Sequence, residues 1–117
     1  MNVGDIFIYD SLNKTLELNE PAILLIREFK ALVDRDKSKH KEKAFREFTY
    51  IYLAICWKSP YSQYAEYERH EAALDDSGIT ETEFNDPVFR EACRKYRDLQ
   101  DSSKSIKLLN AARMAAD

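Results

Sequence analysis

The chain has 117 residues, of which 44% are hydrophobic and 33% charged, and its formal net charge at pH 7 is −3. This length fits one domain that can bury a core, and the charge gives no general attraction to nucleic acid or anionic lipid. Two glycines and three prolines favour helices over turn-rich sheets. The longest apolar run is far shorter than the roughly 20 residues of a membrane span, so we expect no membrane association.

No motif for catalysis, for a metal or for a cofactor is present. Two glycines are too few for a phosphate-binding loop, and no G-x-S-x-G nucleophile elbow occurs. Cys56 and Cys93 lack the spacing of metal ligands, and neither has a histidine placed as a catalytic base. With no signal peptide ahead of them, we expect reduced thiols in a cytosolic setting. We therefore expect a protein that is not an enzyme and binds no metal or cofactor.

His70 has an acidic neighbour at helical spacing, because Glu66 lies one turn before it. A four-helix di-iron site needs Glu-x-x-His segments on two helices, and this sequence has neither the spacing nor a second copy. We expect a surface histidine that pairs with a neighbour on its own helix.

The N-terminal segment 1–18 is predicted to be an extended arm or a β-hairpin. Its β-forming run is Ile6, Phe7, Ile8 and Tyr9, and residues 15–18 can return as a second strand after a turn. An isolated hairpin is only marginally stable in water. It therefore lies on the helices of its own chain, or adds a strand to the sheet of another chain, or is a disordered end. In the second case these four residues are candidate partner-binding residues.

The first helix is predicted over residues 20–35. Asn19 is a typical N-cap, and Pro21 fits the first turn because its missing N–H has no helical partner there. A buried stripe then follows at helical spacing: Ala22, Leu25, Ile26, Phe29, Leu32 and Val33. Ile23 and Leu24 stand off this stripe, so we expect the start of the helix to be covered on a second side.

The central helix is predicted over residues 41–57, the densest apolar run in the chain. Two stripes of this helix cover most of its circumference, which indicates burial on several sides: Ala44, Phe48, Ile51 and Ile55, and Phe45, Tyr52 and Cys56. The alternative to a plain core role is a ligand pocket beside Tyr50, Tyr52 and Trp57. We expect the core role, because no polar groups are predicted to converge there.

The next helix is predicted over residues 62–74, after a stop at Pro60. Tyr61, Tyr64 and Tyr67 recur every three residues at its start. Tyrosine is enriched at protein interfaces, so this row is a candidate partner-binding surface. The same residues would equally well cover the central helix with their hydroxyls in water.

The C-terminal half contains a hinge and one or two further helices. Gly78 is predicted to stop a helix, and Thr80 with Glu83 forms a capping box for a short helical turn. A helix over residues 87–100 carries the stripe Phe89, Ala92, Cys93, Tyr96 and Leu99. The polar residues 100–105 either break this helix or belong to a longer one. Ile106, Leu109, Ala112 and Ala116 then form a narrower stripe, and we expect that the last helix frays at its end or continues beyond the chain.

Residues 35–46 are the one basic run. They include four candidate phosphate-binding residues, Arg35, Lys37, Lys39 and Lys41. The plainer interpretation is a solvated connection between two helices. We favour it because the flanking aromatic residues are predicted in the core and leave no base-stacking surface beside the charge.

These elements predict an all-α fold, a small helical bundle of four to five helices with a short N-terminal arm or hairpin. Residues 19–117 form the bundle domain. Helices 20–35 and 41–57 are expected to pair antiparallel, with 62–74 and 87–100 packed across them.

Two segments of the sequence resemble one family of small helical proteins of tailed bacteriophages. The first is NEPAILLIREFKALVDRDKSKHKEKAFREFTYIYLAICWKSPY from Asn19 to Tyr61, and the second is DPVFREACRKYRDLQDSSKSIKLLNAARMAAD at the C-terminus. Members of the family are encoded among virion and morphogenesis genes and run on beyond the point where this chain ends. The resemblance implies a structural or assembly component, present in many copies, in the virion or in the host cytoplasm during assembly. It implies no site residues.

The leading hypothesis is therefore a non-enzymatic phage structural or assembly protein that contacts other phage structural proteins, itself, or both. The alternative is a small phage regulator that binds nucleic acid or the host transcription machinery through residues 35–46. A small-molecule pocket beside Tyr50 and Trp57 is a third and weaker hypothesis.

Overall fold

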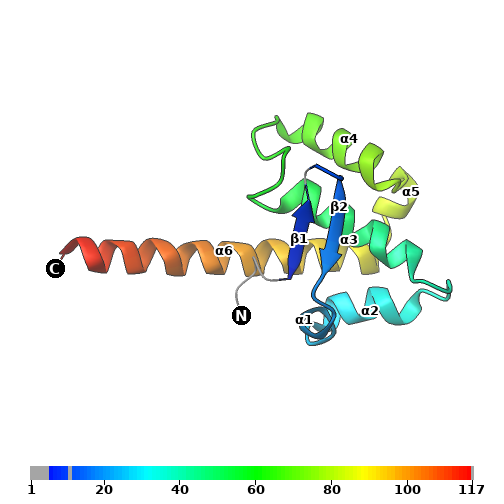
Figure 1. Cartoon of the computed structure of the whole chain (residues 1–117), viewed down its shortest axis with the longest axis horizontal. Coiled ribbons are helices and arrows are strands. Elements are labelled where there is room, and N and C mark those ends of the chain that lie inside the picture. Colours follow the sequence, from blue (N-terminus) through cyan, green and yellow to red (C-terminus); the bar gives the residue numbers. More distant parts are fainter. Residues whose placement is uncertain (1–5, 11, 117) are drawn as a thin grey trace.

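The computed structural model describes residues 6–10 and 12–116, with side chains as far as residue 102. Within these residues it has six helices and one two-stranded antiparallel sheet (Figure 1). In chain order the elements are β1 (Phe7–Asp10), β2 (Thr15–Leu18), α1 (Glu20–Leu24), α2 (Arg27–Arg35), α3 (Glu42–Ile55), α4 (Glu66–Ser77), α5 (Glu81–Phe84) and α6 (Pro87–Ala116). The predicted predominantly helical fold with an N-terminal hairpin is confirmed, with six helices instead of four to five.

The hairpin lies on the helices of its own chain, the first of the three expected alternatives. Phe7 pairs with Leu18 and Tyr9 with Leu16, so alternate residues face the helices. The carboxylate of Asp10 orders the turn by accepting the backbone N–H of Leu12 at 3.0 Å. Burial of one face supplies the stability that an isolated hairpin lacks.

The helix expected over residues 20–35 is two helices, and this expectation is corrected. α1 and α2 are separated at Leu25 and Ile26, where Ile26 has an extended backbone with φ −102° and ψ 112°. The break turns Ile23 into the core beside Ile26, whereas Leu25, expected on the buried stripe, is 78% exposed. Of the two residues expected to be covered on a second side, Ile23 is buried, whereas Leu24 is 45% exposed. Tertiary packing thus overrides the local pattern.

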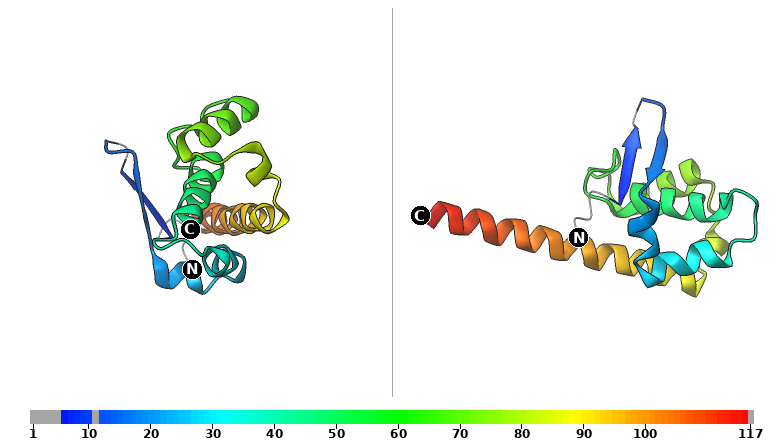
Figure 2. Two further views of the ribbon diagram at one scale, coloured as in Figure 1. Left: turned by 90° about the vertical axis from the view of Figure 1, so that its right-hand side faces the viewer. Right: turned by 60° about the horizontal axis from the view of Figure 1, so that its bottom comes forward.

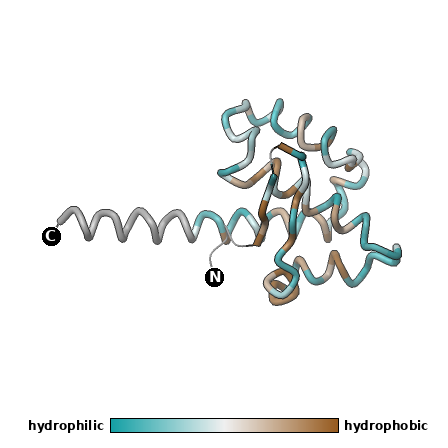
Figure 3. The backbone as a smooth tube through the Cα atoms, in the orientation of Figure 1, coloured by the Kyte–Doolittle hydropathy of each residue, from teal (hydrophilic) through white to brown (hydrophobic). Residues whose placement is uncertain are grey.

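α3 is the centre of the fold, as expected. Both of its predicted stripes are buried except at Phe45, which is 41% exposed. The hairpin and α4 lie on different sides of α3 (Figure 2), and α6 also packs against it. Figure 3 shows that hydrophobic residues gather in α1, in the hairpin strands and in α3, while the outer helix α4 is mostly hydrophilic.

The helix expected over residues 62–74 begins later, at Glu66, and this expectation is corrected. Successive turns precede it, in which the N–H of Ser62 donates to the C=O of Ser59 at 3.0 Å. The Ser59 hydroxyl donates to the C=O of Leu53 at 2.7 Å and so ties these turns to α3. Pro60 was recognised as a helix stop, but its sequence neighbourhood gave no sign of how far the turns extend.

The signals around α5 are confirmed. Gly78 ends α4 in the left-handed region at φ +77°, a conformation that favours glycine. The Thr80 hydroxyl accepts the N–H of Glu83 at 3.1 Å, and the Glu83 carboxylate accepts the N–H of Thr80, also at 3.1 Å. This reciprocal pair fixes the direction in which the chain enters α5 and then α6.

α6 is one continuous helix of 30 residues, which decides between the two alternatives left open for residues 100–105. At 1.5 Å per residue such a helix is about 45 Å long, and the molecule measures 53 × 31 × 29 Å. Figures 1 and 2 show its C-terminal half leaving the rest of the molecule. The polar residues at 100–105 contain no Gly or Pro, the two residue types that interrupt a helix most strongly.

Candidate functional site

Three of the four arm residues proposed as partner-binding belong to the core of their own chain. Ile6 and Phe7 are buried, and Tyr9 stacks on Tyr52 with ring centroids 5.0 Å apart. Four further rings lie 5.3–6.3 Å from that of Phe7, centroid to centroid: Phe29, Phe48, Tyr52 and Tyr96. Ile8, which is 60% exposed, remains as the arm residue open to a partner.

The three tyrosines proposed as one row do not share a helix face. Tyr61 lies in the turns before α4, is half-buried and donates its hydroxyl to the carboxylate of Asp76. Its ring centroid is 4.9 Å from that of Tyr64. Tyr67 stands in the first turn of α4 and is 74% exposed. The exposed phenols are therefore those of Tyr64 and Tyr67, on two different pieces of backbone.

The basic run 35–46 is an ordered connection between α2 and α3, organised by the buried residue Asp36. The Asp36 carboxylate accepts the N–H of Ala44 at 2.8 Å, and the N–H and hydroxyl of Ser38 at 2.9 and 2.7 Å. From the other side, the ammonium group of Lys41 donates to the C=O of Asp36 at 2.5 Å. Asp36 thus satisfies an N–H in the first turn of α3, as an N-cap residue does.

Two of the four residues proposed to contact phosphate are engaged within the fold. Lys41 closes the loop onto Asp36, and Arg35 pairs with two carboxylates. Lys37 and Lys39 are exposed, and their ammonium groups make no hydrogen bond or ion pair with the described residues. These contacts favour the interpretation of the run as a solvated connection.

Replacing Asp36 with alanine is expected to lower the free energy of unfolding by about 1–2 kcal/mol at pH 7. Burial by itself raises the pKa of Asp36, but the hydrogen bonds from Ala44 and Ser38 outweigh it and lower that pKa to about 2. The pKa of Asp36 in the fold is below its ordinary value of 3.8. The stabilisation that its carboxylate gives is therefore fully present above about pH 3.8 and is lost as the pH falls toward 2. Urea unfolding of the natural protein and of Asp36→Ala should show a difference in the free energy of unfolding that becomes smaller in acid.

The matched control for Asp36 is Asp34 on the same segment. Its exposed carboxylate pairs with Lys30 at 2.6 Å, one helical turn away, and such surface pairs contribute about 0–1 kcal/mol. A loss at Asp36→Ala no larger than that at Asp34→Ala would contradict the capping role.

A partly buried ion cluster joins α2, α3 and the start of α6. The Arg35 guanidinium donates to Glu47 at 2.6 Å and to Asp86. Burial raises the pKa of Glu47 and outweighs the attraction of Arg35. Burial lowers the pKa of Arg35, but its two carboxylates outweigh this effect and raise it. Burial is the larger effect at Glu47 but not at Arg35, because the Glu47 side chain is 1% exposed and the Arg35 side chain is 27% exposed.

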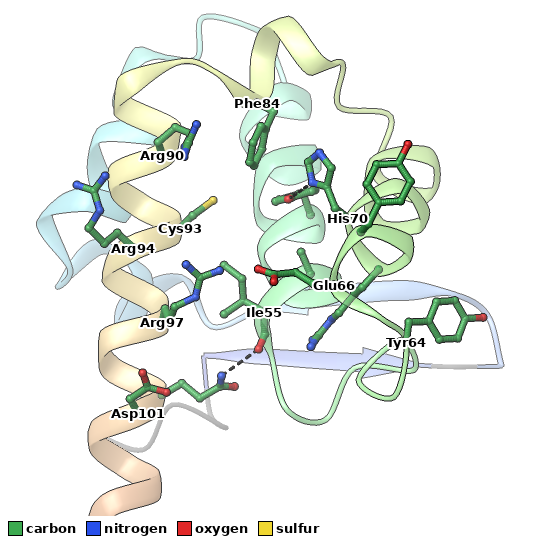
Figure 4. Close-up of a pocket in the computed structure, with 15 residues that line it drawn as sticks. Ile55, Tyr64, Glu66, His70, Phe84, Arg90, Cys93, Arg94, Arg97 and Asp101 are labelled. Carbon is green, nitrogen blue, oxygen red and sulfur yellow. Dashed lines mark hydrogen bonds between the residues drawn. The ribbon is translucent and has the colours of Figure 1, made fainter.

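A cavity lies between α6 on one side and α4 with α5 on the other, over α3. Its volume is about 940 Å³, within the roughly 300–1,000 Å³ typical of small-molecule sites. Figure 4 shows Arg90, Cys93 and Arg97 on α6 across from Phe84 and His70. We call this cavity the α4–α6 pocket.

Polar groups do converge beside Tyr50, contrary to expectation. Its hydroxyl lies 2.7 Å from Nδ1 of His70, and Nε2 of His70 lies 3.1 Å from a carboxylate oxygen of Glu81. A neutral imidazole satisfies both contacts when Tyr50 donates to Nδ1 and Nε2–H donates to Glu81. His70 thus joins α4 to α3 and to the start of α5 instead of pairing along its own helix. Tyr52 and Trp57, proposed beside Tyr50, do not line this pocket.

Two polar side chains hold the walls of the α4–α6 pocket in place. Gln100 on α6 is buried, accepts the N–H of Trp57 at 2.7 Å and donates to the C=O of Ile55 at 2.9 Å. From α4, Arg69 donates to the C=O of Leu53 at 3.0 Å and to that of Cys56 at 2.6 Å. Both side chains satisfy carbonyls at the C-terminal end of α3, which otherwise lack helical partners.

The α6 wall carries three arginines that the sequence analysis did not single out. Arg90, Arg94 and Arg97 follow one another at spacings of four and three residues, so their backbone positions are neighbours on the helix. Arg94 pairs with Glu91 and lies on the outer side of α6 in Figure 4. The spacing was visible in the sequence, but its meaning depends on the opposite wall, which comes from α4 and α5.

No group of three or more His, Cys, Asp or Glu residues in the described part of the chain is arranged to hold a metal ion. No helix among the described residues is long and apolar enough to cross a membrane.

Comparisons with protein-family models, with curated proteins and with solved structures found no match to this chain.

Proposed function

We propose that this protein is a non-enzymatic structural or assembly component that acts by protein–protein contacts, in a tailed-bacteriophage particle or its assembly intermediate. The projecting half of α6 carries the proposal. A helical segment of that length is marginal in water on its own, because its hydrogen bonds hardly offset the cost of starting a helix. Such a segment gains stability when a second chain packs against it.

The sequence of the projecting segment fits a partner helix. Ile106, Leu109, Ala112 and Ala116 recur at spacings of three and four residues, the pattern of an apolar stripe. Small residues within a stripe allow two helices to approach closely. We propose that a second copy of the chain is the first partner, since an assembly component present in many copies meets itself at high local concentration.

Light scattering of the purified protein is expected to show an oligomer that persists at high salt, because apolar contacts are not screened. The double variant Ile106→Glu/Leu109→Glu should return it to the mass of a monomer, since two buried charges would oppose packing. Leu12→Glu is the matched control, because Leu12 is 93% exposed in the hairpin turn.

An oligomer that the double variant does not alter would contradict the role of α6, and a monomer at every concentration would contradict self-association. The phage assignment rests on the resemblance of residues 19–61 and of the C-terminal segment. Mass spectrometry of purified particles of the phage that encodes the chain tests it, and absence from particles and assembly intermediates would overturn it.

A further inference from the structure

We propose that the α4–α6 pocket binds a nucleotide, either as part of a single-stranded nucleic acid or free. The phosphate would lie between Arg90 and Arg97, and the base would lie toward Tyr67. This inference does not depend on self-association through α6, because the pocket is built from residues 50–101 of one chain.

Two arginines on the pocket side of α6 are available to an anion. Arg97 is exposed and makes no hydrogen bond or ion pair with the described residues. Arg90 lies over the ring of Phe84, with its guanidinium carbon 4.9 Å from the ring centroid, and it too has no carboxylate partner among the described residues. Arginine offers its N–H groups in a planar fork that matches the oxygens of phosphate.

The electrostatic balance of the pocket favours an anion although the whole chain is slightly acidic. Four arginines line it, against two carboxylates, Glu66 and Asp101. Arg94 pairs with Glu91, and Arg69 donates hydrogen bonds to carbonyls at the end of α3. Both therefore add positive charge to the pocket but are less available for direct contact with a ligand. The charges of Arg90 and Arg97 also act on Cys93, where they oppose the larger effect of burial, which raises the pKa of that thiol to about 12.

Aromatic side chains beside the arginines point to a nucleotide more than to a simple anion. Phe84 points into the pocket, with its ring centroid 4.6 Å from that of His70 (Figure 4). Tyr67 on α4, which also lines the pocket, is 74% exposed. Single-stranded nucleic acids bind grooves in which basic side chains meet the backbone and aromatic rings stack on bases. Tyr64, in contrast, is turned away from α6 in Figure 4.

The pocket is organised before any ligand arrives. Gln100 fixes α6 to the end of α3, Arg69 fixes α4 to the same end, and His70 links Tyr50 with Glu81. A site whose walls are already fixed loses less conformational entropy on binding.

The test is fluorescence anisotropy of a labelled oligothymidine of about ten nucleotides with the full chain at several salt concentrations. Arg90→Gln/Arg97→Gln should weaken binding about tenfold or more. It should also make the salt slope shallower by about 0.7, since the two arginines hold one phosphate and each phosphate neutralised on a single strand contributes about 0.7. Tyr67→Ala should weaken binding at least about fivefold through lost stacking. Unchanged thermal unfolding of each variant would show that the fold is intact.

Matched controls use the same changes away from the pocket. Lys37→Gln/Lys39→Gln removes two exposed positive charges from the basic run, and Phe45→Ala removes an exposed ring from α3. Neither should alter binding by more than about twofold. If the double lysine variant weakens binding as much as the double arginine variant does, binding depends on the general positive charge of the chain and not on the proposed pocket.

Competitors distinguish the two sources of the nucleotide. Tight binding of the strand with weak binding of thymidine monophosphate supports a nucleic acid, and calorimetric binding of the monophosphate as tight as that of the strand supports a free nucleotide. The proposal is overturned if neither binds, or if the pocket variants lose nothing. It is also overturned if polyglutamate displaces the strand as well as thymidine monophosphate does and Tyr67→Ala has no effect, because the pocket would then take an acidic peptide.

Discussion

Replacing Arg35 with methionine is expected to destabilise the fold by about 3–5 kcal/mol at neutral pH, the usual cost of removing one partner of a buried ion pair. Glu47 would lose its charged partner in a site that exposes 1% of its side chain. Asp86 would lose less, because its side chain is 26% exposed and its other oxygen accepts the N–H of Val88 at 3.0 Å. Typical domains have only about 5–15 kcal/mol of stability, so the effect should be plain in urea unfolding.

The pH dependence of this variant has a definite sign. Burial already raises the pKa of Glu47 in the presence of Arg35, and removing the guanidinium raises it further. A raised pKa means that the fold favours the protonated carboxyl over the carboxylate. The fold is therefore more stable in acid, and stability is lost as the pH rises through the pKa of Glu47. The difference in the free energy of unfolding between the Arg35→Met variant and the natural protein should therefore become smaller as the pH falls.

Two further variants separate charge from packing at this cluster. Arg35→Met/Glu47→Leu should recover most of the loss, because an apolar pair of similar volume replaces a buried ion pair at little cost. Arg27→Met on the same helix should change stability by less than about 1 kcal/mol, since the Arg27 side chain is 94% exposed and lies 3.6 Å from Glu28. A double variant no more stable than Arg35→Met would contradict the buried-charge explanation.

Replacing Phe48 with alanine is expected to cost about 3–5 kcal/mol, because the cavity left in a packed core adds to the lost transfer free energy. Phe48 is fully buried, and its ring centroid lies 5.6 Å from that of Phe29 on α2 and 6.0 Å from that of Phe7 on β1. One substitution thus loosens contacts of the hairpin and of two helices. Thermal and urea unfolding measure the loss.

Phe45 provides the control for Phe48 on the same helix. Its side chain is 41% exposed, so Phe45→Ala removes less buried surface and should cost less than about 1.5 kcal/mol. Phe48→Leu keeps most of the volume and is expected to cost under about 1.5 kcal/mol, which provides a measurable protein if the alanine variant does not fold. Equal losses at positions 45 and 48 would contradict the central packing role of Phe48.

Local signals in the sequence determined most of the helical fold. Asn19, the capping box of Thr80 and Glu83, and Gly78 were recognised, because each acts on backbone groups within four residues of itself. The buried stripes of α3 and of the first half of α6 followed from helical spacing, since one face of each helix must be covered. The hairpin was recognised as a pattern, but the sequence left open what covers it.

Only the tertiary structure decided which of several compatible arrangements the chain adopts. It broke residues 20–35 into α1 and α2 so that Ile23 enters the core, and it placed Phe7 among rings from three helices. It also buried Glu47 against Arg35, which comes from another helix. Sequence periodicity describes one element at a time, whereas burial depends on what the neighbouring elements bring.

The same distinction holds for the candidate site. The sequence drew attention to residues 35–46 because their charges are adjacent along the chain, yet Asp36 and Glu47 engage much of that run. Arg90 and Arg97 lie seven positions apart in the sequence, and they form one wall of a pocket because α4 and α5 lie opposite α6. Chemistry between residues distant in sequence arises from the packing of helices, and a linear pattern of residue types does not contain it.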